Sequence, residues 1–236
     1  PDMASGTDII KLPESAPVAQ GLGHSIARQS YRNFLTAPLG ADSLSQWLSV
    51  LQARQLPDAT LPKRRYASAG GLYPVRLYLQ LKDDAVAGLE AGTYLYDPRQ
   101  HRLALVKQQS MDDAVFGHDN FSMATQSRIA LFLVAHWPAV KPAYADWSRD
   151  ACLMEAGAMA HLLAEQGPGL AIGSCLIGNT DSKAIMQALL SRGNQDNCHD
   201  TCHDTCHDNE LLLAMLAGPV TEAQTQTWQG PSTQAS

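Results

Sequence analysis

Two arginines lead into a glycine pair and then a strand-like run in the stretch KRRYASAGGLYPVRLYL. Arg64 and Arg65 carry permanent positive charge on a planar fork of donors that suits a phosphate group. Gly70 and Gly71 leave the backbone bare, so a ligand can approach their N–H groups closely. Ser68 adds a hydroxyl group. A glycine-containing loop that enters a strand between solvated arginines gives the same pattern, because a short glycine motif is a weak signal.

Two other segments carry groups of the same kind. Arg28, Ser30 and Arg32 lie close together in RQSYRNF, and two arginines with a hydroxyl near a helix end make a phosphate clamp. A basic, exposed helix face is the alternative interpretation. The segment GSCLIGN, residues 173–179, offers bare backbone after an apolar strand. The three segments together suit a flat, phosphate-tailed ligand better than a nucleoside triphosphate, since neither a P-loop nor a dinucleotide-binding glycine motif is present in the sequence.

Hydrophobic periodicity predicts the elements that must position these groups. The pattern mixes helices and strands without a regular strand–helix–strand repeat, which favours an α+β fold over a doubly wound sheet. The best helix, DWSRDACLMEAGAMAHLLAEQG, has an apolar face and ends before a glycine. The predicted helices are 24–34, 42–54, 146–167 and 181–192, and the predicted strands are 75–82, the hairpin 92–107, 128–137, 170–179 and 210–220.

Two of these elements carry more detailed expectations. The helix 42–54 is predicted to be capped by Asp42 or Ser43. The run RIALFLVAHW, residues 128–137, is almost entirely apolar, which is typical of a strand buried on both faces. The apolar stripe of the first helix comprises Leu44, Trp47, Leu48 and Leu51, and that of the helix 146–167 comprises Cys152, Ala156, Met159 and Leu163, with Gly167 as its end.

Length and composition exclude several classes of protein. The 236 residues suit one domain, or two small ones. A net charge of -6 argues against a nucleic-acid-binding protein. No apolar run reaches the roughly 20 residues of a membrane span, and the first residues do not read as a signal peptide. The odd count of 5 cysteines argues against a secreted disulfide scaffold, so we expect a cytoplasmic protein. The predicted organisation is an arm over 1–23, a domain over 24–220 and a flexible polar tail over 221–236.

The order of five motifs resembles the flavin-dependent nitroreductase superfamily. The motifs are RQSYRNF, RRYASAGGLYPV, GTYLYDPRQHRL, YADWSRDACLMEAGAMAHLL and AIGSCLIG. More closely, the chain is similar to SagB-type dehydrogenases and to the oxidase domains of nonribosomal peptide synthetases. The resemblance runs from about Leu12 to Val220. It implies a nitroreductase-like α+β fold, with a mostly antiparallel central sheet wrapped by helices, and usually a homodimer that binds its cofactor between subunits.

The resemblance implies FMN as the cofactor, held by three groups of residues. The residues implied to bind the phosphate and ribityl chain are Arg28, Ser30 and Arg32, with Arg65 as a further phosphate contact. Those implied to lie along the isoalloxazine edge are Ser68, Ala69 and Gly70. Those implied to offer backbone near flavin N5 are Leu176, Ile177 and Gly178.

The same resemblance implies an oxidation of azolines to azoles. A base takes the acidic proton of a thiazoline or oxazoline ring, a hydride passes to the flavin, and oxygen restores the flavin. The substrate would be a peptidyl or aminoacyl group on a carrier protein, handled together with other synthetase domains. Two alternatives stay open: a general NAD(P)H-dependent nitro- or quinone reductase, and a non-catalytic flavin-binding docking module of a megasynthase.

The candidate base lies in KPAYADW. Related azoline oxidases carry an adjacent Lys-Tyr pair in this region, and Tyr144 matches the tyrosine, but Ala143 precedes it. Lys141, three residues away, is the cation that could assist Tyr144 if the turn at Pro142 brings it back. A free tyrosine has a pKa of about 10 and needs such a cation to act as a base at neutral pH. The alternative is that Tyr144 packs and Lys141 is solvated.

The segment NCHDTCHDTCHDN, residues 197–209, repeats Cys-His-Asp-Thr in steps of four. Cysteine and histidine at such spacing can bind zinc. A duplicated short segment has the same appearance, and relatives are shorter here. We therefore expect an inserted surface loop and no metal site.

Overall fold

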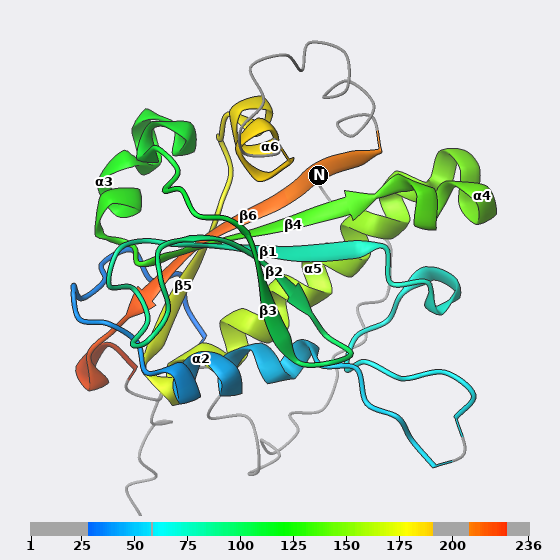
Figure 1. Ribbon diagram of the computed structural model, residues 1–236, viewed down its shortest axis with the longest axis horizontal. Helices are drawn as coiled ribbons and strands as arrows, with labels where there is room; N and C mark the ends of the chain where they lie inside the picture. The colour runs from blue at the N-terminus through cyan, green and yellow to red at the C-terminus, as the bar shows by residue number, and fades with distance from the viewer. Residues whose placement is uncertain (1–27, 58, 191–207, 226–236) are drawn as a thin grey trace, which may run out of the picture.

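The computed structural model describes residues 28–57, 59–190 and 208–225. Its centre is a 6-stranded sheet with the order β3-β2-β1-β4-β6-β5 (Figure 1). Every pairing between neighbouring strands of this sheet is antiparallel. The strands are β1 Val75–Leu81, β2 Gly92–Asp97, β3 Arg102–Lys107, β4 Ile129–His136, β5 Ile172–Ile177 and β6 Asn209–Pro219.

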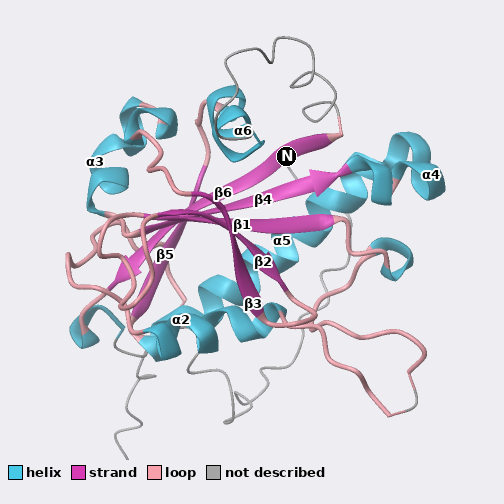
Figure 2. Ribbon diagram, viewed as in Figure 1, coloured by secondary structure: helices cyan, strands magenta, loops and turns pink. Residues whose placement is uncertain are grey.

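Helices cover both faces of the sheet, as Figure 2 shows. One face packs against α2 and α5 through a core that includes Trp47 and Met159. The opposite face packs against α3 and α6 through a second core that includes Phe116 and Ile185. The α-helices are α2 Ala41–Leu48, α3 His118–Gln126, α4 Lys141–Tyr144, α5 Ser148–Gln166 and α6 Ser182–Leu190.

The central strands match the sequence prediction. Leu131, Phe132, Leu133 and Val134 of β4 have 0% exposed surface, so the expectation of a strand buried on both faces is confirmed. The predicted hairpin is β2 and β3. The α+β class and the mostly antiparallel sheet are likewise confirmed by the observed strand pairings. The strands could be predicted because an alternating apolar pattern indicates which side of a strand faces a core.

The predicted helix over 24–34 is wrong in its described part, because residues 28–35 form no helix. The backbone N–H of Tyr31 donates to the carbonyl of Ser174 at 3.1 Å, and that of Leu35 donates to Pro219 at 2.8 Å. The segment is thus tied to the strands β5 and β6 rather than to itself.

Two glycines make room for this segment. A Cβ added at Gly173 would lie 2.6 Å from Cγ of Tyr31, and one added at Gly218 would lie 2.9 Å from Cβ of Phe34. Both aromatic side chains are buried. Burial of two rings against the sheet therefore decides the local conformation, in place of helix propensity.

The ends of two helices also differ from the prediction. Gly40 is the N-cap residue of α2, so the expected cap by Asp42 or Ser43 is wrong. The apolar stripe of that helix is buried as expected. The helix α5 is preceded by the 3₁₀ turn Ala145–Trp147, and Gly167 keeps a helical conformation and continues into a second 3₁₀ turn instead of ending the helix at once.

The predicted N-terminal arm lies outside the described residues, as does the Cys-His-Asp-Thr repeat apart from Asp208 and Asn209. The first residues of the predicted flexible tail form a short 3₁₀ turn, Glu222–Thr225. Gln224 of that turn donates to the carbonyl of Asn33 at 3.3 Å. Among the helices that the structure describes, none has the length and apolar character needed to cross a membrane.

Candidate active site

The loop between Ser68 and Tyr73 has a conformation that its glycines permit. The φ angles are 58° at Gly70, 66° at Gly71 and 52° at Tyr73. Positive φ is ordinary for glycine and costs energy for a residue with a Cβ. The strain at Tyr73 is offset by a hydrogen bond from its backbone N–H to Oγ of Ser68 at 2.8 Å. Ser68, predicted to lie along a ligand edge, therefore also holds the loop together.

Arg64 supports the loop from below. Its guanidinium lies 4.2 Å from the centroid of the Tyr73 ring, and its Nη1 donates to Oη of Tyr66 at 2.6 Å. A guanidinium on an aromatic face is attracted by the negative potential of the ring. Arg64 is thus fixed in the structure, whereas Arg65 is exposed.

Glu155 of α5 lies beneath the same loop and is 2% exposed. Its Oε1 accepts a hydrogen bond from the N–H of Val75 at 3.3 Å, and it also bonds with the Ser68 side chain. Burial raises the pKa of the Glu155 carboxyl, and the hydrogen bonds from Ser68 and Val75 and the charge of Arg64 oppose that shift. The carboxyl therefore connects the two ends of the 68–75 segment. The sequence signal that could have found it is a lone carboxylate within the apolar stripe of the helix.

Replacement of Glu155 by glutamine should change how stability depends on pH. Because its folded-state pKa is raised, the folded protein binds more protons than the unfolded chain above the ordinary value of 4.5. The free energy of unfolding should then fall as pH rises from that value to the raised one, by at most about 1.4 kcal/mol per pH unit. The Glu155→Gln variant should lack this decline. Urea unfolding of both proteins between about pH 4.5 and 8 measures it; identical slopes would contradict it.

Tyr144, the candidate base, lies over this loop. A Cβ added at Gly70 would be 3.0 Å from Oη of Tyr144, so the phenol oxygen faces bare peptide backbone. The tyrosine ends α4, and the next residue, Ala145, has a positive φ of 45°. The ring is half-buried and packs at 5.7 Å, centroid to centroid, from Trp147. Residues 74 positions apart in the sequence, predicted separately as loop and base, are therefore adjacent.

Lys141 points elsewhere in this structure. Its Nζ lies 5.2 Å from the centroid of the Trp137 ring. Within the described part of the chain, Lys141 and Tyr144 share neither a hydrogen bond nor an ion pair. The turn at Pro142 therefore does not bring the ammonium group onto the phenol oxygen.

The segments RQSYRNF and GSCLIGN, both predicted to contact the ligand, meet at a separate cavity of about 240 Å³. Arg28 and Ser30 line it from one side, Leu176 from β5, and His161 from α5. Arg32 is exposed, with its Nη1 near the Ser30 carbonyl at 3.4 Å, and neither it nor Arg65 lines this cavity. Sequence reasoning missed His161, because a histidine on the polar side of a helix carries no signal of its own.

The three residues predicted near flavin N5 are divided by strand alternation. The Leu176 side chain is 50% exposed beside Arg28, whereas Ile177 is buried in the core under α6. Gly178 follows at the end of β5 and lines a different cavity, of about 330 Å³, with Asn179. A Cβ added at Gly178 would meet no atom within 4 Å. The backbone is open at Gly178.

These residues fit a phosphate-tailed flat cofactor such as FMN. Arg28 and Ser30 bring charge and a hydroxyl to a concave site, as a phosphate requires. A Cβ added at Gly71 would also meet no atom within 4 Å, so a flat ring can approach the peptide there. Both groups of residues lie against α5, the Ser68–Gly71 loop near Glu155 and the arginine cavity near His161.

Comparisons with known proteins identify similar sequences and folds. The model of the nitroreductase family matches residues 26–193. Indigoidine synthase of Dickeya dadantii is 30% identical over 146 residues, which are 57% of this chain and 9% of that protein. This chain thus spans a small part of that relative's length.

Solved structures share the fold. A chain of the E. coli microcin synthetase McbBCD complex, solved with truncated pro-MccB17 bound, has a TM-score of 0.67 at 17% identity, covering 92% of this chain and 79% of that one. An FMN-dependent nitroreductase from Clostridium difficile has a TM-score of 0.52 at 14% identity, covering 89% and 92%.

Proposed function

The chain belongs to the nitroreductase family, and on that premise we propose that it is an FMN-dependent oxidase of azoline rings in nonribosomal peptide biosynthesis. The family expected from the sequence motifs is confirmed. The observation that carries the proposal is the Tyr144 hydroxyl close to the backbone of Gly70, because it sets a candidate base beside Gly71, whose backbone is open to a flat ring. The similarity to indigoidine synthase and to the microcin synthetase chain supports a role in this kind of biosynthesis.

In this proposal, the cofactor is held along the middle of α5, between the loop near Glu155 and the cavity near His161. Arg28, Ser30 and Arg32 would bind the phosphate and ribityl chain, with Arg65 as an outer contact. The backbone of Ser68, Ala69 and Gly70 would lie along the isoalloxazine edge. The peptides of Leu176, Ile177 and Gly178 would face the N5 side. When bound, FMN supplies the two-electron acceptor of the oxidation.

Tyr144 is proposed to remove the acidic proton of the substrate ring. A proton on the ring carbon beside both a carbonyl and the ring C=N is acidic, so a positioned phenolate is a sufficient base. Lys141 lies three residues earlier on the same short helix, and rotation of its side chain away from Trp137 would bring its charge toward the phenol. The half-buried position of Tyr144 limits the access of water to the transferred proton.

The partners follow from the same reasoning. The substrate is proposed to be a peptidyl or aminoacyl group presented by a carrier protein, with other synthetase domains acting before and after the oxidation. A homodimer would complete the cofactor site, since the exposed Arg32 and Gly71 leave part of the proposed binding surface open.

Purified protein should be yellow, with absorbance bands near about 370 and 450 nm, and heat should release FMN. Added FMN should raise the midpoint of thermal unfolding, because a ligand that binds only the folded state stabilises it. The Arg28→Gln variant should bind FMN about 10-fold or more weakly, as expected for a lost charge-assisted hydrogen bond. The exposed Arg99, in the β2–β3 turn, provides the matched Arg99→Gln control.

Substrate tests then separate the candidate reactions. A thiazoline-containing peptide should bleach the flavin without oxygen and yield the thiazole. Bleaching by NADPH alone, with no azoline oxidised, would identify a general reductase instead. A colourless protein that FMN does not stabilise would remove the proposal.

A further inference from the structure

We propose that a third cavity, between β1, β2 and α5, binds a small planar carboxylate on Arg64. The cavity has a volume of about 440 Å³, within the range of about 300–1,000 Å³ that small-molecule sites occupy. It is separate from the cavity at Arg28, since the two share no lining residue. The inference concerns residues outside the proposed FMN contacts and stands independently of the proposed function.

The cavity exists because two strands diverge. The strands β1 and β2 are paired from Tyr78 with Leu95 to Leu81 with Gly92, and no pairing continues toward Val75. The hairpin of β2 and β3 therefore swings away from β1 (Figure 1). The cavity lies where the two strands separate, between the sheet and α5. Continued strand pairing would fill this space.

Arg64 lines this cavity and has one guanidinium donor without an acceptor among the described residues. Its Nη1 donates to Tyr66, and its face lies on the Tyr73 ring. Its Nε is buried and has no hydrogen-bond acceptor within the described residues. A buried donor without an acceptor costs about 1–3 kcal/mol, so such groups call for a ligand or water. The two oxygens of a carboxylate match the Nε–Nη2 edge in a bidentate pair.

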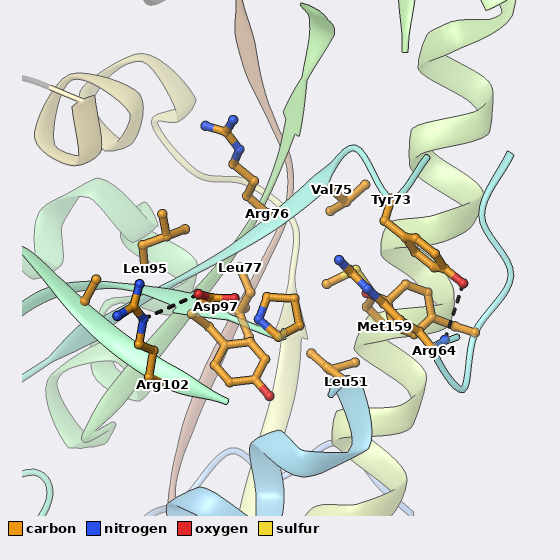
Figure 3. Close-up of a pocket in the computed structure, with 14 residues that line it drawn as sticks. Leu51, Arg64, Tyr73, Val75, Arg76, Leu77, Leu95, Asp97, Arg102 and Met159 are labelled. Atoms are coloured by element: carbon orange, nitrogen blue, oxygen red, sulfur yellow. Dashed lines mark hydrogen bonds and ion pairs between the residues drawn. The ribbon is translucent and has the colours of Figure 1, made fainter. Parts of the chain in front are cut away.

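The charges around the cavity leave Arg64 as the group that can accept an anion. At the outer side, Arg102 pairs with Asp97 at 3.4 Å. The Arg76 side chain points away from the other lining residues (Figure 3). Among the described residues, Glu155 forms no ion pair with Arg64, and its Oε1 accepts from the N–H of Val75. Burial raises the pKa of Tyr66 to about 12, so its hydroxyl keeps its proton.

The remaining lining selects a flat, apolar body. Leu51, Val75, Tyr96 and Met159 are buried side chains of the cavity, and Figure 3 shows Leu51, Val75 and Met159 gathered around Arg64 and Tyr73. Aromatic, aliphatic and thioether groups favour a ring. A single guanidinium with one unpaired donor favours a monoanionic carboxylate over a phosphate, which usually draws on several donors. The ligand class is therefore an aromatic or heteroaromatic carboxylate.

The test uses the purified protein as it is isolated, with its methionine methyl groups labelled with ¹³C. Met159 lines the cavity, and its NMR signal is assigned by loss in the Met159→Leu variant. Benzoate should shift the Met159 signal in a saturable manner. Benzamide has the same shape without the charge and should bind at least about 10-fold more weakly.

Variants of Arg64 locate the charge. Arg64→Lys keeps the charge but loses the planar fork, and it should bind benzoate about 10-fold more weakly. The Arg99→Gln variant should bind it like the unmodified protein. Since Arg64 also packs on Tyr73, the circular dichroism and thermal unfolding of each variant are recorded to check that it is folded. The comparison of benzoate with benzamide tests the role of charge in the unmodified protein.

Three outcomes would overturn the assignment. The first is a Met159 signal that benzoate leaves unmoved. The second is equal binding of benzoate and benzamide, which would show that the cavity binds the ring and does not recognise the carboxylate. The third is inorganic phosphate competing as strongly as benzoate, which would make it a general anion site.

Discussion

Replacement of Tyr144 by phenylalanine is expected to lower kcat for azoline oxidation by about 10²–10⁴-fold, the usual contribution of a positioned base. Flavin content should not change, because the ring remains over Gly70 and only the hydroxyl is removed. Stopped-flow measurement of flavin bleaching by a thiazoline substrate, without oxygen, gives the rate of the step directly.

The control is Tyr94→Phe, which removes a hydroxyl that donates to the Glu90 carbonyl at 2.9 Å, on a strand that carries none of the proposed FMN-binding or catalytic residues. It should retain full activity. A Lys141→Met variant tests the assisting cation, and its rate should reach a plateau at higher pH than that of the unmodified protein. A Tyr144→Phe protein with unchanged bleaching would show that another group removes the proton.

Replacement of Gly173 by alanine is expected to destabilise the fold by about 1–3 kcal/mol and to weaken FMN binding as well. The added Cβ would lie 2.5 Å from Cγ1 of Val220 and 2.6 Å from Cγ of Tyr31. Both neighbours are buried, so relief requires a backbone shift. Because Tyr31 anchors the segment that carries Arg28 and Ser30, the proposed phosphate contacts should move with it.

The matched control for Gly173→Ala is Gly40→Ala, at the N-cap of α2, where an added Cβ has only Ser43 Oγ at 3.7 Å as a neighbour. It should cost less than about 1 kcal/mol and leave FMN affinity unchanged. Urea unfolding and FMN titration measure both effects. Equal losses in the two variants would mean that packing of Tyr31 on the sheet does not support the cofactor segment.

Much of the fold follows from the sequence because its pattern reports burial directly. The apolar run of β4 and the stripe of α5 are long enough that one face or both must be inside, whatever surrounds them. Local chemistry also gives the Gly70–Gly71 turn, since few other residues accept positive φ at consecutive positions. The order of motifs was sufficient to indicate the family.

Only the tertiary structure decides what distant segments do to one another. The segment around Tyr31 reads as a helix locally, but it lies along the sheet because Gly173 and Gly218 leave room for two rings. The approach of Tyr144 to Gly70 depends on how α4 follows β4, which no local pattern encodes. In the sequence Glu155 is one polar residue in a helix. Its contacts with Ser68 and Val75 exist only because the fold brings both ends of the 68–75 loop to α5. The cavity at Arg64 exists because two strands stop pairing, and strand register is set by contacts across the whole sheet rather than by either strand alone.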